Sequence, residues 1–277
     1  MTEETFTQIT RIKPAHSRLS LNLKEIWAYR ELLYFLTWRD VKIRYKQTAI
    51  GIGWTILQPI LTTAIFTVIF STFARFDTAA IPYSLFALSG LMIWLFVHNA
   101  ITIASNGFVN NANLVTKVYF PRLIVPLAAT LAGVIDLFFS FLILIILMLY
   151  YGISLTWQIL WVPVFVLLAI VQAVALGTLF SALNVRFRDV KFALPFVLQV
   201  WMIASPIFYP QSLVPEKWKL IFAVNPLTGI LEGFRSALFG TPADWALIGV
   251  SLISVFLCVA VSLFVFKQME DDFADLI

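Results

Sequence analysis

The stretch KEIWAYRELLYFLTWRDVKIRYKQTAIGIGWTILQP, residues Lys24–Pro59, joins a charged segment rich in aromatic residues to a long apolar run. On a helical wheel with about 100° between residues, aromatic side chains share one face and basic side chains the next. Rings at headgroup depth beside cations are typical of a helix in the membrane interface. The stretch predicts an amphipathic interface helix over residues 24–50 that enters a membrane span after Gly53. It is either a passive surface anchor or a helix that a cytoplasmic partner pushes.

The composition requires a bilayer as solvent. Hydrophobic residues make up 61% of the 277 residues and charged residues 12%, against about 25% charged in soluble domains. One Cys and two distant His argue against a disulfide or a metal site. The net charge of +4 is no signal for nucleic acid. We expect an all-α integral membrane protein with one membrane domain, no metal and no nucleic-acid partner.

Six apolar runs approach the ~20 residues that span a bilayer. They are Trp54–Phe73, Leu85–Ala104, Ile124–Tyr150, Leu160–Leu183, Phe192–Tyr209 and Ala246–Phe266. We therefore predict a six-span domain over residues 51–267, with tails at 1–23 and 268–277. No cleaved signal peptide is expected in the polar N-terminal tail. With the N-terminus inside, 15 of the 19 Lys and Arg residues fall in inner segments, which predicts cytoplasmic termini.

The segment over residues 210–245, between the fifth and sixth predicted spans, is not hydrophilic. We expect short helices over Pro215–Val224 and Leu227–Phe239, separated by Asn225-Pro226 and ended by Gly240. Such a pair predicts a re-entrant outer hairpin, which needs protein or a water-filled cavity around it. The alternative is a helix pair lying on the outer leaflet. Glu232 and Arg235 have the i, i+3 spacing of a pair on one helix face.

Motifs for catalysis are absent from the sequence. It contains no GxxxxGK[ST] loop, no HExxH and no CxxC pair, so we expect no catalytic residue. Asp136 is the one acidic residue well inside a predicted span, which makes it a candidate functional group. A structural partner for an Arg or a hydroxyl, or a lining role, is favoured over a proton relay, because no second ionisable group lies at that depth.

Short motifs along nearly the whole chain resemble one family. They are RY at 44–45, GIGW at 51–54, LQP at 57–59, NL at 113–114, FPR at 120–122, NVRFRDV at 184–190, SP at 205–206 and NP at 225–226. In their order and spacing the chain resembles the membrane subunits of ABC exporters for bacterial surface polysaccharides, which carry O-antigen, capsule or wall teichoic acid.

The resemblance implies a bacterial inner-membrane permease that forms a homodimer and binds two copies of a separate ATPase. ATP and Mg would belong to that partner, and this chain would need no cofactor. The loop at 105–122 would supply a coupling helix, with Asn111, Asn113 and Lys117 as candidates. The hairpin at 210–245 would form outer gate helices, with candidates Asn225, Pro226, Glu232 and Arg235.

The implied substrate is an undecaprenyl-diphosphate-linked polysaccharide of O-antigen type, moving along a channel at the dimer interface. Aromatic side chains stack on sugar faces, and the channel candidates are Tyr83, Trp94, Trp201, Phe208 and Tyr209, although packing against lipid explains most aromatics. The candidates for the diphosphate are Arg39, Lys42, Arg44 and Lys46, and the alternative is that they only satisfy the positive-inside pattern. Rival functions are capsule or teichoic-acid export, an ion-coupled secondary transporter, or an integral-membrane enzyme.

Overall fold

The computed structural model describes residues 23–46, 53–73 and 81–276. Within these ranges every regular element is a helix. Five helical segments are long and apolar enough to cross a membrane. They are α3 (Gly53–Thr67, continued by a π-helix at Val68–Phe73), α4 (Tyr83–Ser105), α7 (Ile124–Tyr150), α8 (Val162–Arg186, preceded by a 3₁₀ helix at Trp157–Trp161) and α12 (Trp245–Met269). The prediction of an all-α membrane protein is confirmed to this extent.

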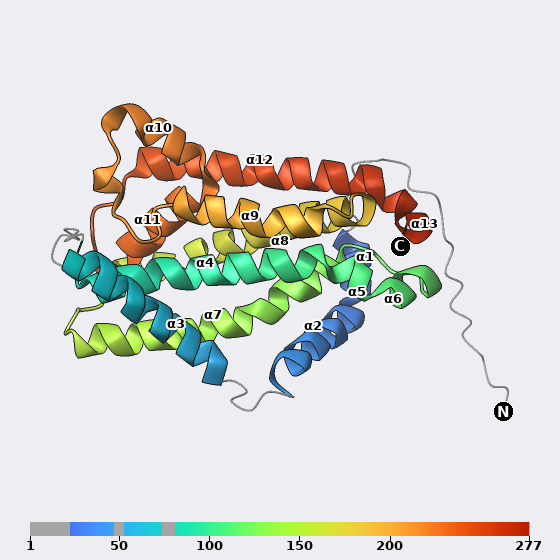
Figure 1. Cartoon of the computed structure of the whole chain (residues 1–277), viewed down its shortest axis with the longest axis horizontal. Coiled ribbons are helices and arrows are strands. Elements are labelled where there is room, and N and C mark those ends of the chain that lie inside the picture. The colour runs from blue at the N-terminus through green and yellow to red at the C-terminus, as the bar shows by residue number, and fades with distance from the viewer. Residues whose placement is uncertain (1–22, 47–52, 74–80, 277) are drawn as a thin grey trace, which may run out of the picture.

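Helix α4 is the centre of the bundle. In its most apolar window 72% of residues are buried, against 17–39% in the windows of the other four. Figure 1 shows α4 running along the bundle beside α7 and α8, while α3 crosses it at an angle. Small residues allow the close approach to α8: a Cβ added to Gly177 would lie 2.9 Å from that of Ala104.

The fifth predicted span is shorter than the sequence suggested. We expected a span over Phe192–Tyr209, but α9 covers Val190–Ile203 and residues 204–209 form turns. Fourteen residues of helix reach about 21 Å, less than the ~30 Å hydrocarbon core. The chain leaves the helix just before Ser205-Pro206, where proline disfavours helical backbone at the preceding residue. The apolar run therefore corresponds to a helix too short to cross the hydrocarbon core by itself, followed by a folded turn.

The segment between α9 and α12 contains the two short helices that the sequence predicts. Helix α10 spans Glu216–Val224 and α11 spans Pro226–Phe239, after a 3₁₀ turn at Gln211–Leu213. The Asn225 side chain accepts a hydrogen bond from the Leu227 amide and caps α11. Gly240 ends α11 with a φ of 69°, in the left-handed region that favours glycine. Asn-Pro and Gly thus set the helix bounds locally.

Arg235 ties α11 to the turn after α9. Its side chain is 5% exposed and donates to the carbonyls of Pro206 (2.7 Å), Ile207 (2.7 Å) and Phe86 (3.2 Å). Its guanidinium also lies 3.7 Å from the centre of the Phe86 ring. The predicted pairing with Glu232 is not among the hydrogen bonds found for this side chain. Backbone carbonyls satisfy the buried cation instead, and they fix the turn over residues 204–209.

One end of the bundle gathers segments from both ends of the chain. Helices α1 (Leu23–Ala28), α2 (Arg30–Tyr45), α5 (Gly107–Asn110), α6 (Ala112–Lys117) and α13 (Phe273–Leu276) lie there, whereas α10 and α11 lie at the other end (Figure 1). Phe273 is fully buried, with its ring 4.8 Å from that of Phe108 in α5. The expected C-terminal tail is therefore helical over its described part and packed against α5, in the predicted coupling loop.

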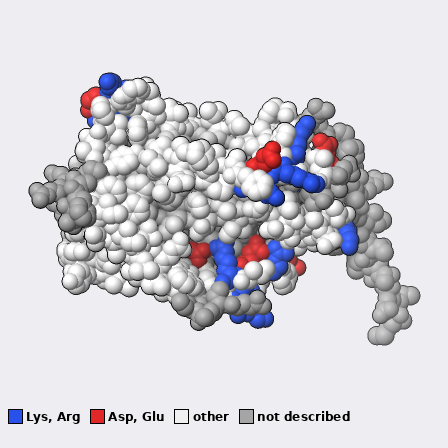
Figure 2. All heavy atoms as spheres, in the orientation of Figure 1, with Lys and Arg blue, Asp and Glu red and all other residues white. Residues whose placement is uncertain are grey.

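The predicted interface helix is interrupted and shorter in its described part. A turn at Tyr29 separates α1 from α2, and α2 ends at Tyr45; residues 47–50 of the prediction lie outside the described residues. Trp27 is 71% exposed and Tyr34 62%, while Leu36 and Val41 are buried. Figure 2 shows charged side chains gathering over α2, near α13 and over α10, with a broad uncharged surface between them.

Candidate functional site

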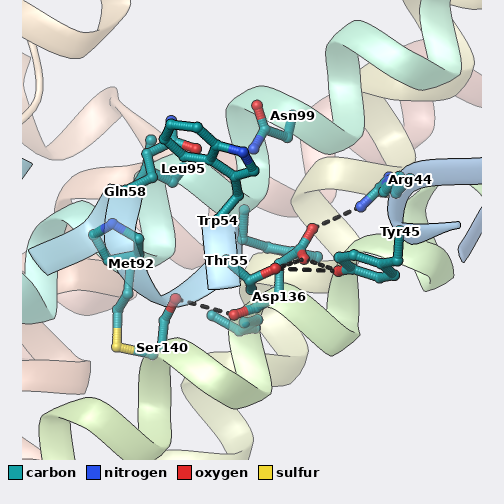
Figure 3. Close-up of a pocket in the computed structure, with 13 residues that line it drawn as sticks. Arg44, Tyr45, Trp54, Thr55, Gln58, Met92, Leu95, Asn99, Asp136 and Ser140 are labelled. Carbon is teal, nitrogen blue, oxygen red and sulfur yellow. Dashed lines mark hydrogen bonds and ion pairs between the residues drawn. The ribbon is translucent and has the colours of Figure 1, made fainter. Parts of the chain in front are cut away.

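A polar cluster joins α2, α3 and α7 where α2 ends. The Arg44 guanidinium lies 2.7 Å from a carboxylate oxygen of Asp136, and the Tyr45 hydroxyl donates to the other oxygen. Thr55 Oγ1 lies 3.3 Å from Asp136 and 3.4 Å from the Tyr45 hydroxyl. Figure 3 shows the three partners converging on the carboxylate. One acidic side chain within an apolar helix thus holds the end of α2 and the start of α3.

The surroundings of Asp136 explain how the carboxylate is accommodated in a membrane helix. A charged group at membrane depth needs an opposite charge and hydrogen bonds around it. Arg44 supplies the charge, and Tyr45 and Thr55 supply hydroxyl groups. Burial raises the pKa of Tyr45, and donation to Asp136 raises it further, so this hydroxyl keeps its proton. The predicted role of Asp136 as a partner for an Arg and for hydroxyls is confirmed.

A cavity of about 190 Å³ opens beside this cluster. Its lining comes from α2, α3, α4 and α7. The residues are Arg44, Tyr45, Trp54, Thr55, Gln58, Pro59, Met92, Leu95, Phe96, Asn99, Asp136, Leu137 and Ser140. Arg44 Nη2 is buried and has no hydrogen-bond partner among the described residues. The cavity therefore adjoins a neutralised ion pair and has the side-chain amides of Gln58 and Asn99 on its wall.

The sequence did not single out Thr55, Gln58, Asn99 or Ser140 as site residues. Their common signal is a polar side chain within an apolar run, but such residues are common in membrane helices and often bond to their own backbone. Ser140, for example, donates to the carbonyl of Asp136. Only the packing of α3, α4 and α7 brings them around one cavity.

The four diphosphate candidates divide into two pairs. Arg39 bonds to the Asp40 carboxylate at 2.7 Å and 3.0 Å, and Arg44 pairs with Asp136. Lys42 and Lys46 are exposed, and Lys42 Nζ lies 5.5 Å from the centre of the Trp38 ring. The arginines are therefore neutralised by carboxylates, whereas the lysines present their charge outward.

Arg39 also connects α2 to the predicted coupling loop. Its Nη1 donates to the side-chain oxygen of Asn111 at 2.7 Å, and the Asn111 amide donates to the Gly107 carbonyl at 2.7 Å. A second cavity, of about 380 Å³, lies at this junction between α2, α5 and α7. The other coupling candidates, Asn113 and Lys117, are exposed on α6. Asn111 is thus a contact within the subunit, while α6 presents the other two outward.

Four of the five aromatic candidates contact one another in two pairs, Tyr83 with Phe208 and Trp94 with Trp201. Tyr83, Trp94 and Phe208 are buried within one subunit, and the Tyr83 hydroxyl donates to the Phe208 carbonyl at 2.7 Å. Trp94 meets Trp201 edge to face at 5.6 Å, and the Trp201 indole donates to Asn225 at 2.9 Å. Trp201 and Tyr209 are only partly buried. The channel role of these five residues stays a prediction.

Comparison with known proteins places the chain in a family. The family model for the ABC-2 type transporter matches residues 31–239, from α2 through α11. The chain belongs to the ABC-2 type transporter membrane family. With its five apolar helices, this family member is a multi-pass membrane protein. No group of His, Cys, Asp and Glu that could hold a metal occurs among the described residues.

Individual relatives of this ABC-2 family member cover most of the chain. The O-antigen export system permease protein RfbA of Klebsiella pneumoniae is 28% identical over 94% of this chain and 100% of its own length. The protein of the same name from Myxococcus xanthus is 27% identical over 91% of this chain and 98% of its own. The polysialic acid transport protein KpsM of Escherichia coli is 25% identical over 82% and 87%.

Proposed function

We propose that this chain is the membrane subunit of an ABC transporter that exports an undecaprenyl-diphosphate-linked polysaccharide of O-antigen type across the bacterial inner membrane. The observation that carries the proposal is the similarity to O-antigen export permeases over 91–94% of this chain and 98–100% of theirs. The polysialic acid transporter matches less of the chain at lower identity, so capsule export is the second candidate.

The energy source in this proposal is a separate ATPase. The sequence carries no phosphate-binding loop, so ATP and Mg would bind to that partner. The exposed helix α6, with Asn113 and Lys117, is the proposed docking element. Since α5 and α6 are tied to α2 through Asn111 and Arg39, movement of a docked ATPase would reach the helix that leads into α3.

The proposed topology has six crossings with both termini in the cytoplasm. In this arrangement α9 and the turn at 204–209 provide the fifth crossing, and α10 and α11 form a re-entrant hairpin on the outer side. Support comes from the burial of α11, whose residues 227–231 and 233–238 are all buried. A helix lying on the outer leaflet would expose one face, whereas a re-entrant helix requires protein around it.

The proposed assembly is a homodimer with a channel along its interface. Outward-facing Lys42 and Lys46 are the preferred contacts for the diphosphate, because neither pairs with a carboxylate among the described residues, whereas Arg39 and Arg44 do. A lysine acts on phosphate as a point charge. In this proposal the lipid-linked anion would bind beside the last turn of α2.

Deletion of the gene in its host tests the proposal. We expect polysaccharide to disappear from the cell surface and to accumulate, lipid-linked, on the cytoplasmic side. Expression of the chain together with its ATPase should return the polysaccharide to the cell surface. Expression of the chain with a hydrolysis-deficient ATPase should not. Normal surface polysaccharide in the deletion strain would refute the proposed function.

A further inference from the structure

The cavity beside Arg44 and Asp136 is electrically balanced. These two residues, 2.7 Å apart, are the charged groups among its described lining, so the site carries no net charge. A diphosphate would bring further negative charge next to Asp136, whose charge already neutralises the single cation. Like charges in a partly buried site disfavour each other. The balance therefore argues for an uncharged polar occupant.

The amide groups on the cavity wall suit adjacent hydroxyls. Gln58 and Asn99 place side-chain amides on the wall of the cavity. The contact found for the Asn99 amide is with the neighbouring His98 ring, at 3.3 Å. An amide both donates and accepts hydrogen bonds, as does a sugar hydroxyl, whereas a phosphate oxygen only accepts.

Aromatic rings supply an apolar wall on the same cavity. Trp54 is 50% exposed and Phe96 is buried, and Figure 3 shows the Trp54 indole beside Asn99, across from Asp136. The C–H face of a sugar ring packs against such a ring. At about 190 Å³ the cavity is smaller than the roughly 300–1,000 Å³ of sites for drug-sized ligands, so it accommodates little more than one ring.

We infer that this cavity binds one sugar ring of the exported glycan, while the diphosphate stays outside it at Lys42 and Lys46. The inference rests on the proposed function and adds a site for the carbohydrate portion. The geometry of α2 supports the pairing, since Arg44 and Tyr45 face the cavity from the same last turn that presents Lys42 and Lys46 outward. Recognition thereby extends from the lipid anchor to the first part of the glycan.

Two lipid probes separate the two parts of the ligand. The complex with its ATPase, in lipid nanodiscs, would be titrated with undecaprenyl diphosphate and with the same lipid carrying one N-acetylhexosamine. We expect the sugar to strengthen binding by about tenfold, as a few hydrogen bonds allow. Gln58→Ala and Asn99→Ala should remove most of that gain and leave binding of the sugar-free probe unchanged. The control is Ile60→Ala, because Ile60 is exposed on the same helix as Gln58 and lies outside the cavity. It should change the binding of neither probe.

Each other outcome has a definite meaning. The sugar site is refuted if the unmodified complex binds the two probes equally, or if Gln58→Ala weakens the binding of both probes equally. Neither result would contradict the export function. No binding of either probe overturns the proposed function itself. Because Gln58 is exposed, its replacement by alanine should not unfold the chain, which keeps the test valid if Asn99→Ala is unstable. The double variant Lys42→Gln with Lys46→Gln should weaken the binding of both probes. Unchanged binding would contradict the placement of the diphosphate.

Discussion

Arg44 and Asp136, 92 positions apart in the sequence, form an ion pair with 2.7 Å between nitrogen and oxygen. The side chains are 18% and 25% exposed, so both charges are largely removed from solvent. Through this pair the end of α2 is fixed to the middle of α7. The ion pair connects α2 to the bundle and forms one wall of the candidate sugar site.

The pair predicts strong coupling between its two members. Asp136→Asn leaves Arg44 without its counter-charge and should lower the free energy of unfolding by about 2 kcal/mol. Arg44→Gln should do the same, and the double variant should lose much less than the sum. Thermal unfolding of the purified complex in nanodiscs measures the stability loss of each single variant and of the double variant. Additive losses would show that the ion pair does not contribute as a unit.

The link between Arg39 and Asn111 predicts a defect in coupling. Asn111→Ala removes the acceptor for Arg39 Nη1 and the donor to the Gly107 carbonyl. We expect export and substrate-stimulated ATP hydrolysis to fall about threefold or more, as the loss of a charged hydrogen bond implies, at normal membrane levels. Asn110→Ala, at the neighbouring exposed position that ends α5, is the matched control. Equal effects of both variants would argue against the link.

Arg235 predicts a large effect on stability. Arg235→Met leaves the carbonyls of Pro206 and Ile207 without their donors, and Arg235→Lys cannot reach all of them at once. Each should lower the stability of the complex by about 3 kcal/mol, with reduced amounts in the membrane. The comparison is Lys219→Met, which breaks an exposed pair with Glu216 and should be nearly neutral for stability. Wild-type stability of Arg235→Lys would mean that the carbonyl cage is not required.

The C-terminal turn is predicted to support the coupling loop. Phe273→Ala removes a buried ring that touches Phe108 and Phe266 and should cost about 3 kcal/mol of stability at this end of the molecule. Leu276→Ala, 44% exposed in the same helix, should be nearly neutral. Faster hydrogen exchange at residues 105–117 in the first variant and not in the second would support the packing. Unchanged exchange in both would contradict it.

Local chemistry determined how much of this structure was predictable. Apolar length located the five long helices, and Asn225-Pro226 with Gly240 located the bounds of α11, because capping and left-handed backbone depend on nearby residues. The length of α9 was mispredicted because Ile207 to Tyr209 are apolar yet belong to a turn that Arg235 holds. The partner of Asp136 could be predicted as an Arg or a hydroxyl but not by number, since long-range packing selects Arg44. Long-range packing likewise brings Asn99 and Gln58 to one cavity, and no local sequence signal identifies them.

The most direct measurement is transport in reconstituted vesicles. The chain and its ATPase would be inserted into vesicles that contain lipid-linked O-antigen polysaccharide, with ATP added on the ATPase side. The account predicts ATP-dependent appearance of the glycan on the opposite side, detected by a lectin or glycosidase confined there. It also predicts no appearance when a non-hydrolysable ATP analogue replaces ATP. ATP hydrolysis without movement of the glycan, in vesicles where the complex is intact, would contradict the account.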